Sequence, residues 1–120
     1  KFFMWNWIIS TGSNSNTEWH IHSTTQNEFD QVSIWHNSTN LVTDHPGSNN
    51  STWWPGRIHF GGRSNNNEWS SGEFAEFLVW DTVISDIERL KVEGYIAHKW
   101  NVTNRLPTDH PFKNHSPESD

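Results

Sequence analysis

Tryptophan is unusually frequent in this sequence and constrains how the chain can build a core. Nine of the 120 residues are Trp, although only 32% of the residues are hydrophobic. Disordered chains are poor in aromatic residues, so this composition indicates a folded protein. Each aromatic ring buries roughly 150–250 Å², and a few large rings therefore have to supply most of the buried area. The length suits one such core and one domain.

The charge and the lack of cysteine exclude several classes of protein. Eight basic and 14 acidic residues give a net charge of −6 with His neutral, which does not fit the basic surface of a nucleic-acid-binding protein. A chain without Cys has no disulfide framework and no Cys-ligated zinc. No stretch reaches the roughly 18 apolar residues of a membrane helix, so we expect neither nucleic acid as a partner nor membrane insertion.

Short apolar or alternating runs separated by polar loops predict about six strands. The expected strands are residues 2–9, 18–23, 30–37, 41–43, 57–62 and 73–81. The third and fourth strands are expected to form a hairpin with its turn at 38–40. Both faces of the last strand are apolar, which is typical of a central strand covered on both sides.

After residue 81 the apolar residues change to a helical spacing. Ser85 and Glu88 match the Ser-x-x-Glu capping box, which predicts one helix over 86–99. Two neighbouring stripes should face the core. They are Ile87, Leu90, Gly94 and Ala97, and beside them Val92, Ile96 and Trp100. The proline-rich residues that follow should run extended over the surface, with 113–120 frayed.

Strands followed by one late helix predict an all-β fold, an antiparallel two-sheet sandwich of the jelly-roll type with one C-terminal helix over 86–99. The domain is expected to span 1–112. A complete sandwich usually has more strands, so we expect strands upstream of Lys1, or another chain, to complete the sheet. Because no signal peptide is visible and the single Met is Met4, we also expect a processed product or part of something longer.

Several motifs of the C-terminal half carry a family resemblance. They are GG at 61–62, GEFAEFLVWD at 72–81, ISD at 84–86, KVEGYIAHKW at 91–100 and LPTDHPF at 106–112. This pattern resembles the C-terminal half of laminin-G-like, concanavalin-A-like jelly-roll domains of secreted bacterial proteins and phage structural proteins. A weaker resemblance, to the strand–turn–strand hairpin of these domains, covers 30–42.

The resemblance implies a two-sheet jelly roll that recognises glycans or proteins without catalysis, sometimes with calcium at the loop ends. It also implies structural roles within the helix and the tail. Gly94 and Ala97 would let the helix pack closely against the sheet, and Trp100 and Phe112 would cover its ends. None of these residues carries chemistry, so the resemblance supplies no catalytic site.

Aromatic residues in amide-rich loops are the candidate glycan-binding residues. A sugar offers an apolar face for a ring and hydroxyl edges for amides. The candidates are Trp53, Trp54, Trp69, Asn65, Asn66 and Asn67. The alternative is that these rings fold inward and cover the ends of the sandwich. The tryptophans assigned to the core are Trp5, Trp7, Trp19, Trp80 and Trp100, and Trp35 is left open.

Metal and catalytic sites are weaker candidates. His20 and His22 share one strand face, and His59 has the same facing on another strand, so adjacent strands would bring three imidazoles together for zinc or copper. Calcium is possible at loop carboxylates, since hard cations need several oxygen ligands. The available acids are Asp30, Asp44, Glu68 and Glu73. Glycosidases need two acids on one face, whereas the spacing of Glu73 and Glu76 places them on opposite faces of a strand.

The sequence therefore predicts a non-enzymatic recognition module for glycan binding or adhesion, located outside the cell, on a cell surface or on a virion surface. The alternative is a structural assembly module of a virion or an extracellular filament that contacts neighbouring protein subunits. An open sheet edge favours this alternative because it invites an added strand.

Overall fold

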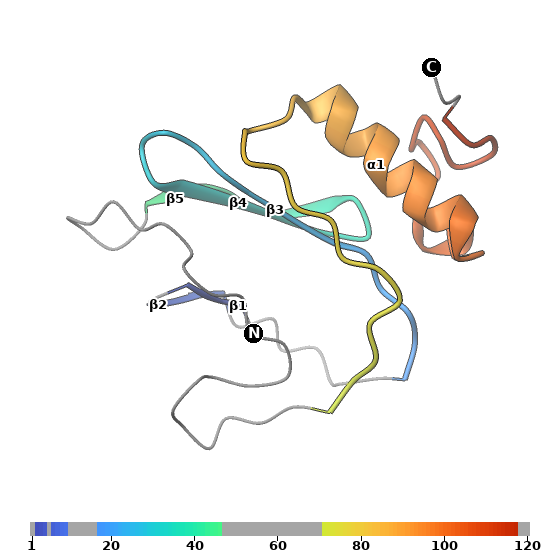
Figure 1. The fold of residues 1–120 in the computed structure, drawn as a ribbon, viewed down its shortest axis with the longest axis horizontal. Coiled ribbons are helices and arrows are strands. Elements are labelled where there is room, and N and C mark those ends of the chain that lie inside the picture. The colour runs from blue at the N-terminus through green and yellow to red at the C-terminus, as the bar shows by residue number, and fades with distance from the viewer. Residues whose placement is uncertain (1, 5, 10–16, 47–70, 118–120) are drawn as a thin grey trace.

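The computed structural model describes residues 2–4, 6–9, 17–46 and 71–117 (Figure 1). The elements within these ranges are β1 (Phe2–Met4), β2 (Asn6–Ile9), β3 (His22–Gln26), β4 (Gln31–His36), β5 (Thr39–Pro46), α1 (Asp86–Lys99) and the 3-10 helix η1 (Thr103–Arg105). None of the helices in these ranges is long and apolar enough to cross a bilayer. The predicted strand at 57–62 lies outside the described residues.

The first apolar run forms two short strands instead of the single strand predicted over 2–9. β1 and β2 pair antiparallel, with Phe3 opposite Trp7 and Met4 opposite Asn6. This pairing satisfies backbone N–H and C=O groups within the run itself, which a single extended strand leaves to other partners.

The main sheet is antiparallel and has the order β3-β4-β5. β4 lies in the middle, with His22 opposite His36 on one side and Thr39 opposite His36 on the other. Asn37 and Ser38 form the turn with φ values of 49° and 65°, as a type I′ hairpin requires. The predicted hairpin is confirmed, although its turn begins one residue earlier and β5 is longer than predicted.

The start of β3 differs from the predicted strand at 18–23. Asn27 Oδ1 accepts hydrogen bonds from the backbone N–H groups of Phe29 and Gln31, each at 3.0 Å. This side-chain bond fixes the turn before β4 at 27–30. The residues just before the turn then pair with β4, so β3 runs from His22 to Gln26 and includes a stretch predicted as a connection.

Helix α1 has the predicted bounds and the predicted cap. The backbone N–H of Glu88 donates to Ser85 Oγ at 3.4 Å, and the Ser85 N–H donates to Glu88 Oε2 at 2.8 Å. Its buried face agrees with the predicted one in part, since Gly94 and Ala97 are buried as predicted. Ile87 is 53% exposed, whereas Arg89 and Glu93 are buried together with Gly94 and Ala97. Arg89 and Glu93 form an ion pair with each other, which allows these two charged residues to lie on the buried face in place of apolar ones.

The C-terminal tail folds back along α1 instead of running extended (Figure 1). His98 Nε2 lies 2.9 Å from the Phe112 carbonyl oxygen, and Lys113 donates to the carbonyls of Thr103 and Leu106. Leu106 is 2% exposed and packs with Ile21 and Ala97 in a core that joins the sheet, the helix and the tail. Contacts of the tail therefore continue past residue 112, where the domain was predicted to end.

The predicted central strand at 73–81 is not a strand in the structure. The backbone from 71 to 83 makes no ladder with any other described strand, and it leads directly into α1 (Figure 1). Side chains on both of its faces are exposed, since Phe74, Phe77 and Val79 have exposed fractions of 63%, 51% and 63%. An apolar sequence forms a buried strand only where neighbouring strands bond to it.

Three of the tryptophans assigned to the core are instead exposed. Trp19, Trp80 and Trp100 have exposed fractions of 46%, 45% and 43%, so the assignment was wrong for these rings. Trp35, left open by the sequence, is half-buried on β4. The side chains of Trp5 and Trp7 lie outside the described part of the chain.

Candidate functional site

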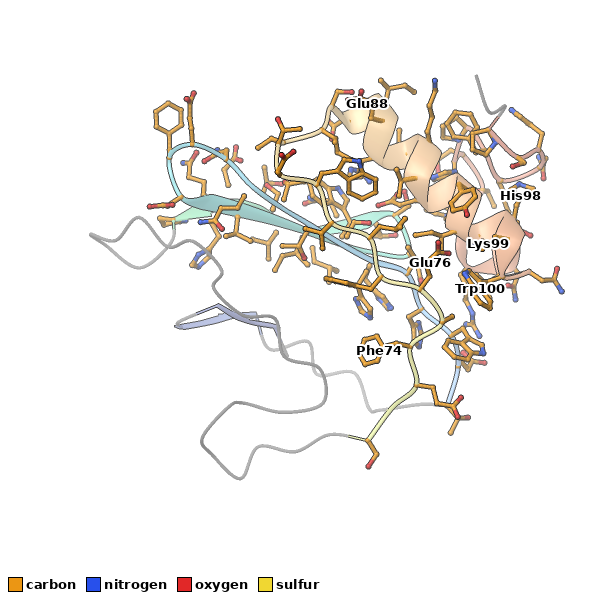
Figure 2. The ribbon with its side chains drawn as sticks, in the orientation of Figure 1. Phe74, Glu76, Glu88, His98, Lys99 and Trp100 are labelled. Carbon is orange, nitrogen blue, oxygen red and sulfur yellow. The ribbon has the colours of Figure 1, made fainter. Side chains whose placement is uncertain are left out.

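Two aromatic rings near the C-terminal end of α1 form an exposed platform. Tyr95 and Lys99 are one helical turn apart, so their side chains lie on the same side of the helix. Trp100 caps the helix beside them. Tyr95 is 41% exposed and Trp100 is 43% exposed. Figure 2 shows Lys99 and Trp100 at this end of α1, with Glu76 reaching them from the preceding extended segment.

Hydrogen bonds connect the polar groups at the edges of this platform. Lys99 Nζ donates to Glu76 Oε1 at 3.0 Å and to the Tyr95 hydroxyl at 2.9 Å. The indole Nε1–H of Trp100 donates to Glu76 Oε2 at 2.8 Å. The ammonium group also lies 5.2 Å and 5.8 Å from the Tyr95 and Trp100 ring centroids, within the range of a cation–π contact. We call Glu76, Tyr95, Lys99 and Trp100 the aromatic platform.

The charges of the aromatic platform stabilise each other. The hydrogen bond from Trp100, followed by that from Lys99, lowers the pKa of Glu76. The bond to the Tyr95 hydroxyl, followed by that to Glu76, raises the pKa of Lys99. Both groups are therefore charged at neutral pH. A carboxylate with a lowered pKa is a poor general acid but a good hydrogen-bond acceptor for hydroxyl groups.

A second cluster of polar residues is buried between α1, β3 and the tail. Glu93 is 1% exposed, and both of its oxygens accept hydrogen bonds from Arg89 Nη1 at 2.9 Å. Ser23 Oγ of β3 donates to Glu93 Oε1 at 2.6 Å. The Arg89 guanidinium lies 4.2 Å from the centre of the Trp35 ring. These contacts attach α1 to β3 and β4.

His110 joins this cluster from the tail. The backbone N–H of Phe112 donates to His110 Nδ1 at 3.2 Å, so the neutral ring carries its proton on Nε2. That nitrogen is buried without a hydrogen-bond partner and lies 3.8 Å from Glu93 Oε2. Because Ser23 bonds to Glu93 and not to His110, the arrangement is not a nucleophile–base triad. We interpret the cluster of Ser23, Arg89, Glu93 and His110 as a structural contact and call it the buried clamp.

Three imidazoles meet beside the β4–β5 turn. His20, His22 and His36 have ring centroids 4.8–6.2 Å apart. His36 was not part of the predicted histidine group, and His59, its predicted third member, lies outside the described residues. Burial, followed by the nearby imidazoles, lowers the pKa of His22 to about 4 and also lowers the pKa of His36.

The predicted glycan-binding residues Trp53, Trp54, Trp69, Asn65, Asn66 and Asn67 lie outside the described residues, as does the calcium candidate Glu68. Of the other calcium candidates, Asp30 accepts a hydrogen bond from Gln26 Nε2 at 3.1 Å, and Asp44 Oδ1 lies 3.4 Å from Ser33 Oγ. Throughout the described ranges, no three His, Asp or Glu side chains form a group that could hold a metal ion.

The sequence prediction missed Tyr95 and Lys99 and placed Trp100 in the core. The Tyr-x-x-x-Lys spacing does signal a cation–π pair on one helix face. The contribution of Glu76 had no such signal, because it lies 23 residues before Lys99.

Comparison of the chain with protein-family models, curated proteins and solved structures finds no match. The laminin-G-like resemblance is therefore carried by the motif residues alone, and the fold and function that it implies are treated below as proposals.

Proposed function

We propose that this chain is a non-enzymatic recognition module that binds glycans through the aromatic platform. The observation that carries the proposal is the joint exposure of Tyr95 and Trp100 beside a fixed carboxylate and a fixed ammonium group. An exposed ring packs against the C–H face of a sugar, and the neighbouring charged groups bond to its hydroxyls. The platform supplies both kinds of contact side by side.

A single platform of this size binds weakly. Stacking contributes about 1 kcal/mol per ring beyond area burial, and surface hydrogen bonds add little because they replace bonds to water. Useful affinity then comes from several copies acting together. This fits a module displayed on a cell surface or a virion surface, where many copies face many glycans.

The proposal includes a laminin-G-like, two-sheet jelly-roll sandwich as the scaffold. Its support is the β3-β4-β5 antiparallel sheet followed by one late helix with the expected bounds. It also includes the predicted loop residues Trp53, Trp54 and Trp69 as a second binding surface, on the sequence argument alone.

Binding to a glycan array tests this function. We expect the wild-type chain, presented in many copies on a bead, to bind a subset of glycans and the Trp100→Ala variant to lose most of this signal. Phe29→Ala is the matched control, because Phe29 is an aromatic residue 74% exposed on the β3–β4 turn. Loss in a Trp53→Ala/Trp54→Ala variant alone would move the site to the loop. Absence of glycan binding by the wild type would refute the function.

The second candidate function is assembly with neighbouring subunits. The segment from Leu78 to Val83 carries exposed apolar side chains, namely Leu78, Val79, Trp80 and Val83, on backbone that forms no ladder with the described strands. Such a segment can add to the sheet of another chain. Light scattering tests this function: a concentration-dependent oligomer that a Val79→Lys variant abolishes would favour assembly over glycan binding.

A further inference from the structure

The two ring nitrogens of His110 in the tail have different surroundings. Its Nδ1 accepts a hydrogen bond from the Phe112 backbone N–H at 3.2 Å, so the proton of the neutral ring is on Nε2. This Nε2 is buried without a hydrogen-bond partner and lies 3.8 Å from Glu93 Oε2. Buried polar atoms in folded proteins almost always have a partner, so the unpaired Nε2–H of the neutral ring calls for an explanation.

Phe112, the partner of Nδ1, anchors the tail on α1. Its Cβ occupies the space that a side chain at Gly94 would fill, and its carbonyl oxygen accepts a hydrogen bond from His98 Nε2 at 2.9 Å. The rings of Phe112 and His110 pack edge to face, with centroids 6.2 Å apart and an interplanar angle of 64°. His110 therefore helps to orient Phe112 against α1.

Protonation of His110 reverses the role of its Nδ1. An imidazolium donates hydrogen bonds from both nitrogens and accepts from neither. The new Nδ1–H would point at the Phe112 N–H, so the hydrogen bond between these two groups would be lost. A backbone N–H without a partner is costly unless water reaches it, which favours movement of Phe112 away from α1.

The charged groups around His110 provide a new contact for the protonated ring. Glu93 and Arg89 face the ring from α1, and Asp109 precedes it in the tail. The two carboxylates attract an imidazolium and Arg89 repels it. A movement of about 1 Å would bring Nε2 from its present 3.8 Å close to the roughly 2.7–2.9 Å of a charge-assisted hydrogen bond with Glu93. Such a bond would satisfy the N–H that the neutral state leaves unpaired.

We propose that His110 is a proton-dependent switch that exchanges its hydrogen bond with the Phe112 N–H for an ion pair with Glu93 and thereby releases Phe112 from α1. The release uncovers α1 at Gly94. It is local, because the bonds from Lys113 to the neighbouring backbone carbonyls do not involve His110. The switch does not depend on the proposed glycan binding. Burial lowers the pKa of His110 below its ordinary value of 6.5, so the release is expected in acidic solution.

The test is an NMR pH titration of the full chain from neutral pH downward. The ring nitrogen signals of His110 should show the Nε2–H tautomer at neutral pH. As the ring becomes protonated, the protection of the Phe112 amide against hydrogen exchange should fall about three- to tenfold, the value of one hydrogen bond. The amide of Ile34, whose side chain is 1% exposed on β4, should keep its protection.

His110→Asn is the variant that separates the switch from a general effect of acid. An Asn side chain can accept a hydrogen bond from the backbone N–H two residues on, and it does not titrate, so Phe112 should stay protected throughout the titration. His115→Asn is the matched control. His115 is a second tail histidine whose ring lies 5.8 Å from that of Phe112, and its replacement should leave the wild-type response unchanged.

Several outcomes would overturn the proposal. They are an Nδ1–H tautomer of His110 at neutral pH, full protection of Phe112 after His110 is protonated, the wild-type loss of protection in His110→Asn, and an abolished response in His115→Asn. Simultaneous loss of protection at Ile34 would also overturn it, because the release would then be global unfolding. If His110→Asn does not fold by circular dichroism, the wild-type titration decides: the midpoints of the His110 ring and the Phe112 amide must coincide, and separate midpoints contradict the switch.

Discussion

Gly94 of α1 and Phe112 of the tail are so close that a Cβ atom on Gly94 would overlap the Phe112 Cβ and lie 3.1 Å from its Cγ. Two effects of Gly94→Ala therefore oppose each other. Alanine favours the helix by about 1 kcal/mol, whereas forcing an extra carbon into a packed contact costs about 1–3 kcal/mol. We expect the contact to dominate, so that urea denaturation shows a net loss of stability.

A double-mutant cycle isolates the cause of that loss. Phe112→Gly removes the Cβ that the new alanine would meet. In that background Gly94→Ala should become neutral or stabilising. If Gly94→Ala destabilises both backgrounds equally, close packing against Phe112 is not the reason for glycine at this position.

The cap of α1 predicts a moderate effect. Ser85→Ala removes the acceptor for the Glu88 N–H and should reduce the free energy of unfolding by about 1 kcal/mol. Ser85→Thr keeps an acceptor at the same position and should retain most of the stability. Thermal unfolding of the three chains measures the difference, and equal midpoints for Ser85→Ala and the wild type would contradict the cap.

The buried clamp predicts a larger effect than the cap. Glu93→Ala removes the buried carboxylate partner of Arg89 and leaves this buried guanidinium with only the exposed carboxylate of Asp86, 3.5 Å from its Nε. Breaking a buried ion pair in this way costs about 3–5 kcal/mol. Glu73→Ala, at an exposed glutamate, is the control and should change the unfolding free energy little. A similar small change for both variants, measured by chemical denaturation, would show that the clamp does not hold α1 to the sheet.

The acid sensitivity of the fold follows from His110. Burial lowers its pKa below the ordinary value of 6.5; Glu93 opposes this shift and Arg89 adds to it. The unfolded chain then binds the proton more readily, so stability is complete above pH 6.5 and falls as the pH drops toward the lowered pKa.

Unfolding free energies at a series of pH values below neutrality measure this slope. His110→Gln should make the slope shallower. Some slope should remain, because the pKa values of His22 and His36 are lowered as well. An identical slope in the variant and the wild type would mean that His110 takes no part in the acid response.

Local signals predicted helix α1 and the β4–β5 hairpin. The Ser85–Glu88 box and the helical spacing after it gave α1 its correct bounds, since both depend on residues within one turn of each other. The hairpin of β4 and β5 was likewise predictable, because strand alternation and a short polar turn are local. The predicted turn began one residue too late. In the structure Asn37 and Ser38 both have positive φ values, and the residue types of the turn did not show that this pair would adopt them.

Contacts between distant residues were not predictable. Glu93 and Arg89 are polar by sequence, yet they fill the face of α1 against β3, because their charges satisfy each other and Ser23 completes the bonds. The indole of Trp100 is large enough for a core, yet it lies at the surface because Glu76 accepts its N–H. The size of an aromatic ring predicts how much surface area it can bury. Whether the ring is buried depends on the residues that contact it in the fold.

The most direct test of glycan recognition follows the indole N–H signal of Trp100 by NMR during titration with a glycan identified on the array. This signal reports both the ring and its hydrogen bond to Glu76, and Trp100→Phe assigns it. We predict a saturable shift of the Trp100 signal, with no shift of the Phe29 backbone amide on the remote turn. Saturable glycan binding that leaves the Trp100 signal unmoved would contradict the proposed site.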